Sequence, residues 1–299
     1  MNDSIDNTDT QRVMLDRSDV RVTHVSSVSG SIREFIDKIK AGDLGSLPVV
    51  VGLVLICGVF TAINPIFLSP SNLVNLLFDC STAGVIALGI VCVLMLGEID
   101  LSVGSMSGVG SALLGVLWVN QGMSLPLAIG ASLCVGAMMG FSYAYLRTRL
   151  GMPSFVSTLA GLLALLGFQL YLLGSTGSIN LPYGSSMVDF GQLMIMPAWV
   201  SHTLAFIPGI VITFMGRRIR NKRHASNLSS KSLKSIFFKA ILVTFALEAA
   251  VFYLNQSRGV PWMFGLFVLL VIAMDYALTR TKWGRSMFAV GGNAEAARR

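Results

Sequence analysis

Long apolar runs separated by short polar stretches make up most of the sequence between residues 41 and 283. A helix that crosses a bilayer needs about 20 largely apolar residues, and these runs approach or reach that length. The pattern predicts an all-α fold, a polytopic transmembrane helical bundle with about eight spans in this chain. The second and third runs are also compatible with one broken helix. We expect the spans at 47–66, 81–96, 103–119, 125–145, 155–173, 200–215, 237–254 and 261–278.

Three regions follow from this pattern. Residues 1–40 are polar and lack the apolar core of a cleaved signal peptide, so we expect a cytoplasmic tail. Within the tail, residues 31–39 have the spacing of a short amphipathic helix, which would lie on the membrane surface or bind a partner. Residues 41–283 are the expected transmembrane domain, with a basic cytoplasmic loop at 217–239. Residues 284–299 are expected to form a short cytoplasmic segment.

The composition agrees with a membrane protein. Hydrophobic residues make up 54% of the chain, charged residues only 12%, and the mean hydropathy is +0.71, whereas soluble domains carry about 25% charged residues. If the N-terminus is cytoplasmic, the eight spans place every Lys and Arg except Arg258 on the same side. Such a bias predicts that both ends of the chain are cytoplasmic. The same bias argues against a re-entrant hairpin at residues 98–105, and it accounts for the net charge of +7 without nucleic acid.

The sequence contains none of the common motifs of enzymes or metal sites. The patterns Gly-x-x-x-x-Gly-Lys-Ser/Thr, His-Glu-x-x-His and Gly-x-Ser-x-Gly are absent, and the 3 histidines and 4 cysteines show no ligand spacing. We therefore expect no catalytic residue, no metal, no cofactor and no ATP site in the chain itself.

Two carboxylates lie at the junction of the second and third runs. Glu98 and Asp100 fall within residues 41–146, which contain no Lys or Arg. A charge at the centre of a bilayer costs roughly 3 kcal/mol on insertion scales, so these acids should lie at an interface, in a cavity or at a working site. Asp100 and Ser102 could cap the free N–H groups at the start of the third span, take part in gating or coupling, or do both.

Four stretches resemble a known family. Residues 97–105 read Gly-Glu-Ile-Asp-Leu-Ser-Val-Gly-Ser, residues 152–161 contain Pro-Ser-Phe-x-x-Thr-Leu-Ala-Gly, and residues 258–261 read Arg-Gly-Val-Pro. Residues 284–297 contain Gly-Arg-x-x-x-Ala-x-Gly-Gly-Asn-x-x-Ala-Ala. In this order they resemble the membrane-spanning permease subunits of bacterial ABC importers for ribose, xylose and related sugars. The spans around the basic stretch 217–239 look like the extra helix pair of xylose-type permeases.

The resemblance implies a function and partners. The chain would be a permease subunit of a binding-protein-dependent importer in the bacterial inner membrane, moving a monosaccharide, D-xylose first, without covalent chemistry. Its implied partners are a cytoplasmic ABC ATPase, a periplasmic sugar-binding protein and a second permease copy, with membrane lipid around them. An ion-coupled secondary transporter and an inactive truncated remnant are the alternatives. Relatives continue through several more spans, so we expect a fragment or a truncated gene product.

Two sets of residues are the candidate sites. Residues 291–292 are expected to break the chain, and Asn293 to cap a short helix that docks on the ATPase. The candidates for the translocation path or gating are Glu98, Asp100, Ser102, Ser105, Asn75 and Thr158. The candidates for ATPase coupling are Gly291, Gly292, Asn293, Glu295, Ala296 and Ala297.

Overall fold

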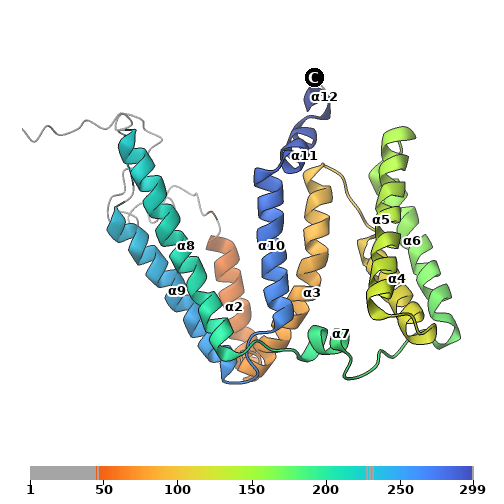
Figure 1. Cartoon of the computed structure of the whole chain (residues 1–299), viewed down its shortest axis with the longest axis horizontal. Helices are drawn as coiled ribbons and strands as arrows, with labels where there is room; N and C mark the ends of the chain where they lie inside the picture. The colour runs from red at the N-terminus through yellow and green to blue at the C-terminus, as the bar shows by residue number, and fades with distance from the viewer. Residues whose placement is uncertain (1–44, 46, 227, 229, 231, 298–299) are drawn as a thin grey trace, which may run out of the picture. The chain divides into compact units, whose positions relative to one another are not determined.

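A computed structural model describes residue 45 and residues 47–226, 228, 230 and 232–297 (Figure 1). The predicted tail and the amphipathic helix at 31–39 lie outside the described residues. The long helices are α2 (Leu47–Ile63), α3 (Pro70–Met95), α4 (Val103–Gly115), α5 (Leu125–Arg149), α6 (Ser154–Leu173), α8 (Ala198–Ala225), α9 (Leu233–Asn255), α10 (Trp262–Arg280) and α11 (Lys282–Gly292). Shorter elements are η1 (Val116–Asn120), η2 (Gly174–Thr176), α7 (Ser186–Val188), η3 (Asp189–Leu193) and α12 (Ala294–Ala297).

The prediction of an all-α polytopic bundle is confirmed. Within the described residues, 7 helical segments are long and apolar enough to cross a membrane, and α2 is a shorter apolar helix. The second and third predicted spans are two helices, since α3 ends at Met95 and α4 begins at Val103.

Two helices extend beyond the predicted spans. α3 begins at Pro70 and not near residue 81, because Asn72, Asn75 and Asp79 lower the hydropathy of its first turns without breaking the helix. α8 continues to Ala225, so much of the basic stretch expected as a loop is helical. Both helices show that an apolar run marks the part of a helix that fits lipid, while the backbone hydrogen bonds continue past it.

The described residues divide into two compact units. The first contains the residues up to Val74 together with Met196–Val260, and the second contains Asn75–Ile195 together with Pro261–Arg299. In the first unit α8 and α9 pack side by side (Figure 1). A Cβ at Gly209 would overlap the Thr244 side chain, so this glycine allows the two helices to approach closely.

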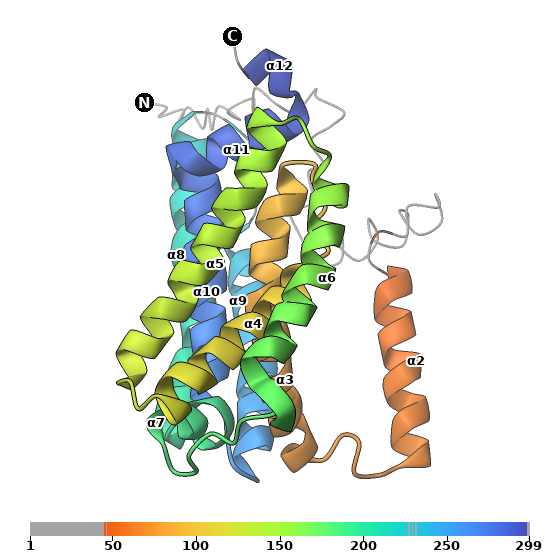
Figure 2. The same cartoon turned by 90° about the vertical axis from the view of Figure 1, so that its right-hand side faces the viewer.

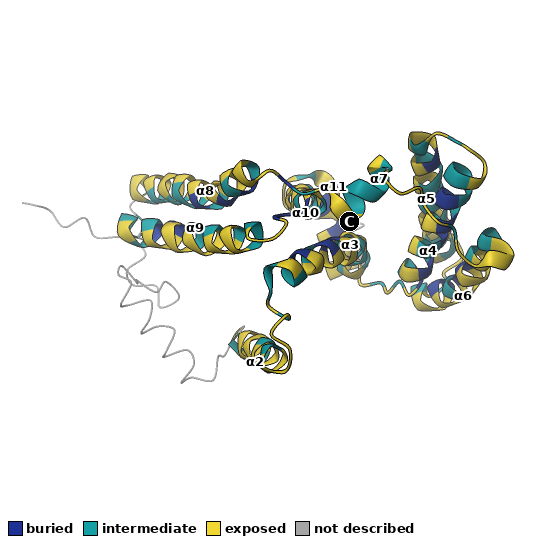
Figure 3. Cartoon of the chain, turned by 90° about the horizontal axis from the view of Figure 1, so that it is seen from below, coloured by how far each residue is buried: buried dark blue, intermediate teal, exposed yellow. Residues whose placement is uncertain are grey.

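In the second unit, α4 packs against α5 and α6 (Figure 2). Val109 of α4 is 0% exposed and is part of the core of this group. Figure 3 shows buried positions along α4, whereas α8 and α9 are exposed over most of their length. Exposed apolar surface of this extent is typical of helices that contact lipid.

Also in the second unit, α10 contacts α3. A Cβ at Gly84 would overlap the ring of Phe267, and the sulfurs of Cys92 and Met274 lie 3.7 Å apart. After α10, Thr281 begins α11 by accepting a hydrogen bond from the Gly284 N–H at 3.2 Å.

The end of α11 differs in part from the prediction. Asn293 does cap α12, because its Oδ1 accepts hydrogen bonds from the N–H groups of Glu295 and Ala296, both at 3.0 Å. The predicted break at Gly291 and Gly292 lies later in the structure, since both glycines belong to α11, which ends at Gly292 and has Asn293 as its C-cap. The reason is packing: a Cβ at Gly291 would overlap the carbonyl oxygen of Met95, so glycine is needed here for close approach to α3.

Candidate functional site

A tight turn ends α3 and begins the segment with the two carboxylates. Gly97 has a φ of +76°, a conformation that glycine adopts at little cost. Its N–H donates to the Leu94 carbonyl at 2.9 Å, and the Glu98 N–H donates to the Val93 carbonyl at 3.3 Å. These bonds satisfy carbonyls that the end of a helix leaves free. The turn releases the chain into the stretch that joins α3 to α4.

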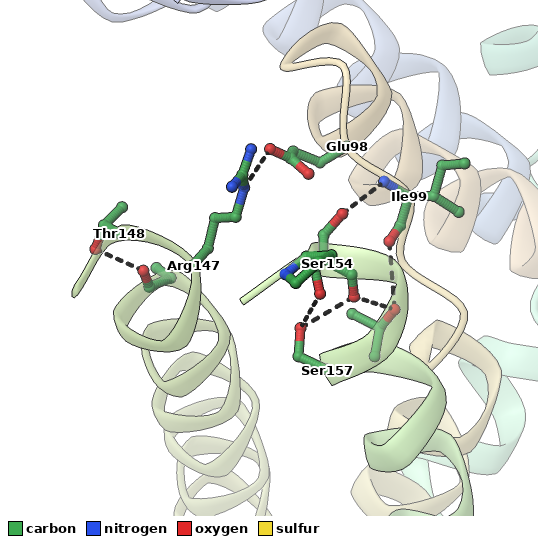
Figure 4. Close-up of polar contacts among 9 residues, drawn as sticks. Glu98, Ile99, Arg147, Thr148, Ser154 and Ser157 are labelled. Atoms are coloured by element: carbon green, nitrogen blue, oxygen red, sulfur yellow. Dashed lines mark hydrogen bonds and ion pairs between the residues drawn. The ribbon is translucent and has the colours of Figure 1, made fainter. Parts of the chain in front are cut away.

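Glu98 pairs with the last turn of α5. Arg147 Nε donates to Glu98 Oε1 at 2.7 Å (Figure 4), with side chains 49% and 26% exposed respectively. A hydrogen bond from the Ser154 side chain holds the pKa of Glu98 below its usual value, burial acts in the opposite direction, and Arg147 lowers the pKa further through its hydrogen bond and charge. Glu98 is therefore a carboxylate at neutral pH, tied to α5 and α6.

The next residue is held by the start of α6. The Ile99 N–H donates to Ser154 Oγ at 3.4 Å (Figure 4). Thr158 Oγ1 lies 3.3 Å from the Ile99 carbonyl and shares its proton between this oxygen and the Ser154 carbonyl, which is closer at 2.8 Å. Thr158 is 3% exposed. Non-helical backbone at membrane depth is tolerated only when protein or water satisfies its polar groups. The hydroxyls of α6 are therefore the groups that contact the N–H and the carbonyl of Ile99.

Asp100 and Ser102 form a local turn before α4. Asp100 Oδ1 accepts hydrogen bonds from the Ser102 N–H and the Ser102 hydroxyl, both at 2.7 Å. Ser102 is 1% exposed, and its carbonyl accepts a hydrogen bond from Ser105 Oγ at 2.9 Å. Ser102 is the N-cap residue of α4, but its side chain makes no capping bond. The prediction of a side-chain cap is therefore wrong for Ser102, and the first turn of α4 keeps N–H groups at the positive end of the helix dipole.

A cavity of about 230 Å³ adjoins this turn. Asp100 and Ser102 line it from the turn, Met106 from α4, and Gly140 and Tyr143 from α5. The Tyr143 hydroxyl is buried and has no hydrogen-bond partner among the described residues. The cavity therefore combines apolar walls with a carboxylate and a helix N-terminus, which suits a small polar solute.

The structure brings together five of the six candidates for the path. Glu98, Asp100, Ser102, Ser105 and Thr158 all belong to this turn or to the side chains that hold it. Asn75 does not join them. It is exposed near the start of α3, 20 residues before the end of that helix, which corresponds to about 30 Å.

The sequence reasoning missed three residues of the site. Arg147 had a signal, because it is the first basic residue after the long stretch without Lys or Arg that contains Glu98. Ser154 lies in the recognised stretch 152–161, but its contact with Ile99 had no signal, and Tyr143 had no signal at all. A Cβ at Gly161 would overlap the Tyr143 hydroxyl, so Gly161 of α6 makes the room that this ring occupies.

The coupling candidates lie beside the same turn at one end. Gly291 of α11 packs on the carbonyl of Met95, three residues before Glu98. The described coupling residues beyond it, Gly292, Asn293, Glu295, Ala296 and Ala297, are exposed. The segment therefore has one residue fixed against α3 and an exposed end available to a partner.

The remaining acids have separate environments. In the first unit, Glu248 Oε2 of α9 lies 2.6 Å from Nδ1 of His202 of α8, so this acid within an apolar stretch has a partner on another helix. The His202 side chain is 35% exposed, so it is partly solvated as well as paired. Asp79 and Asp275 are exposed on α3 and α10.

Comparisons with known proteins place the chain among permeases. The family model described as "Branched-chain amino acid transport system / permease component" matches residues 72–299. The xylose transport system permease protein XylH of Escherichia coli strain K12 is 35% identical over 237 residues, covering 78% of this chain and 58% of XylH. XylH of Haemophilus influenzae is 32% identical over 266 residues, covering 87% and 69%.

A shorter match covers half of the chain. The ribose import permease protein RbsC of Bacillus subtilis is 34% identical over 160 residues, 52% of this chain and 49% of RbsC. The chain thus spans a little more than half the length of the first of these relatives, at 58%. No solved structure matches it significantly. The matches and the apolar helices together identify a multi-pass protein of the inner membrane.

Proposed function

Since this chain belongs to the xylose-type permeases of sugar ABC importers, we propose that it is the membrane-spanning subunit through which a monosaccharide enters the cell. D-xylose is the proposed substrate. The long matches to two XylH proteins support this choice, because they cover 78% and 87% of the chain, whereas the ribose permease matches 52% of it. The basic residues on one side of the predicted spans support cytoplasmic ends.

The observation that carries the proposal is the cavity beside Asp100. A pentose is neutral and presents hydroxyl groups, each of which can donate and accept hydrogen bonds. The cavity offers the Asp100 carboxylate as acceptor and the first N–H groups of α4 as donors. At about 230 Å³, it suits one small solute. Glu98, Ser105, Asn75 and Thr158 are the further proposed residues of the path or its gate.

The second element of the proposal is coupling to an ATPase. A solute can be moved in one direction only if the partner's energy changes the relative stability of two states of the path. The exposed end of α11 and α12, residues 292–297, is the proposed docking site for the cytoplasmic ATPase. The contact of Gly291 with Met95 supports this, because a displacement of α11 would act on the residues just before Glu98. A periplasmic sugar-binding protein and a second permease copy complete the proposed importer.

The test is uptake of labelled D-xylose in cells that lack their own xylose importers. The cells would express this chain with the binding protein and ATPase encoded beside it, and uptake would be measured with ATP depleted and, separately, with an uncoupler. We expect accumulation that requires ATP and survives the uncoupler. Accumulation that collapses with the ion gradient and survives ATP depletion would establish a secondary transporter instead. ATP-dependent uptake of ribose in place of xylose would keep the importer and correct the sugar.

A further inference from the structure

The α8–α9 pair carries an apolar groove of about 620 Å³ that the proposed import path does not use. The groove forms where small residues face each other. Gly209 of α8 meets Thr244 of α9, and Thr213, Ala240, Phe206 and Phe245 also line the groove. Phe245 is 72% exposed, so the groove is open to the surroundings of the described chain.

The groove has the length of one leaflet. Phe206 and Arg217 both line it, and they are 11 residues apart on α8, which corresponds to about 16 Å of helix. The hydrocarbon core of a bilayer is about 30 Å thick, so one leaflet contributes roughly half of this. An acyl chain that entered the groove beside Arg217 would reach Phe206 near the middle of the bilayer.

The two ends of the groove differ in charge. At one end the Arg217 guanidinium lies over the ring of Phe237, 4.7 Å from the ring centroid, a contact that fixes the cation at the rim. Arg220 lies three residues after Arg217 on α8, and Lys234 lies three residues before Phe237 on α9. Residues three apart lie on the same face of a helix, so both cations are near this end of the groove. Residues 217–239 contain no acidic residue. The only acid in the lining, Glu248, lies toward the other end and is paired with His202.

We propose that this groove binds one anionic phospholipid, with an acyl chain along Gly209 and Thr213 and the phosphate at Arg217. The proposal requires that α8 and α9 span the membrane, and it does not depend on which sugar the protein carries. Charge complementarity selects this occupant: a cation at the rim of an apolar groove one leaflet long matches a negative headgroup on an acyl chain. Basic residues near a membrane surface each contribute about 1 kcal/mol to binding of anionic lipid, or about fivefold in affinity.

The test is native mass spectrometry of the purified chain in detergent, with phosphatidylglycerol or phosphatidylcholine added. We expect phosphatidylglycerol to be retained severalfold better than phosphatidylcholine. Arg217→Gln should lower retention of phosphatidylglycerol about fivefold. The matched control is Arg218→Gln, which removes the same charge from an exposed position outside the lining, and it should change retention little. Thr213→Phe should fill the groove and lower retention of both lipids. Soluble glycerol phosphate should not compete, because it lacks the acyl chain.

Three results would overturn the proposal. Equal losses in Arg217→Gln and Arg218→Gln would mean that only the summed surface charge attracts lipid. Equal retention of both lipids would mean that the groove does not distinguish an anionic headgroup from a zwitterionic one. Unchanged retention in Thr213→Phe would mean that lipid binds elsewhere, as it would if another helix or a second copy of the chain covers the groove. Since retention is measured without sugar or ATPase, none of these results bears on the import proposal.

Discussion

Replacing Gly291 by alanine tests the packing of α11 against α3 with a single methyl group. The added Cβ would overlap the Met95 carbonyl oxygen and would lie 3.0 Å from the carbonyl carbon and 3.4 Å from the Leu96 Cα. These are backbone atoms, which cannot rotate away as a flexible side chain could, so overpacking should cost about 1–3 kcal/mol. Alanine would also gain up to about 1 kcal/mol in helix propensity. The matched change, Gly292→Ala, gains propensity with no atom within 4 Å of its Cβ.

We therefore expect Gly291→Ala to be less stable than Gly292→Ala by about 1–3 kcal/mol, the overpacking cost alone. The measurement is denaturant unfolding of each purified chain in detergent, followed by tryptophan fluorescence. Trp283 lies in the same helix and is half exposed, so its emission should report the displacement of α11. Equal stabilities in the two variants, with unchanged emission, would refute the contact between Gly291 and α3 and remove the proposed route from α11 to the Glu98 turn.

Three further results are expected. The pKa of Glu98 is lowered from 4.5. The contribution of the Glu98 carboxylate to the free energy of unfolding should therefore be complete above pH 4.5 and fall as the pH drops below that value. Glu98→Gln should remove this part of the acid dependence in unfolding curves. Glu295→Arg should cut sugar-stimulated ATP hydrolysis by the assembled importer while the purified chain keeps its unfolding midpoint; unchanged hydrolysis would exclude Glu295 from coupling. His202→Leu and Glu248→Leu, alone and together, should give a coupling of about 1 kcal/mol in a double-mutant cycle of unfolding, and additive effects would show that the pair contributes nothing.

The sequence predicts well what depends on local composition. The apolar runs locate the helices, since a membrane span must be long and apolar whatever it packs against. Asn293 is recognised as a cap because its side chain bonds to the N–H groups of Glu295 and Ala296. The carboxylates of Glu98 and Asp100 are recognised as unusual because a charge in an apolar stretch needs a partner. In each case the signal and its cause lie within a few residues of each other.

Contacts between distant segments give no such signal. Gly291 looks like a helix breaker in sequence, and only the carbonyl of Met95 explains why it is a helical glycine. Ser154 and Thr158 lie in the recognised stretch 152–161, but nothing in that stretch indicates that they hold the backbone of Ile99, 55 and 59 residues earlier. Nothing near His202 in the sequence indicates its partner Glu248, which lies 46 residues later. In each case the sequence does not show which face of one helix packs against which segment of the chain.

The contacts around the Glu98 turn differ in strength, and this difference decides how a displacement of α11 would spread. An exposed ion pair such as Glu98 with Arg147 contributes about 0–1 kcal/mol, and the hydrogen bonds of Ile99 are long, at 3.3 and 3.4 Å. The contact of Gly291 with Met95 is steric and can yield only if one backbone moves. The Asp100–Ser102 bonds, both 2.7 Å, fix the turn at the start of α4.

A displacement of α11 would therefore loosen the contacts of Glu98 and Ile99 with α5 and α6 before it deforms the Asp100 turn. In that order of events Asp100, Ser102 and the start of α4 move as one piece relative to Tyr143 on the far wall of the cavity. Such a movement changes the width of the cavity, while the hydrogen bonds between Asp100 and Ser102 stay intact. That is what alternating access would require of the proposed sugar site, which would have to hold its solute in one state and release it in the other.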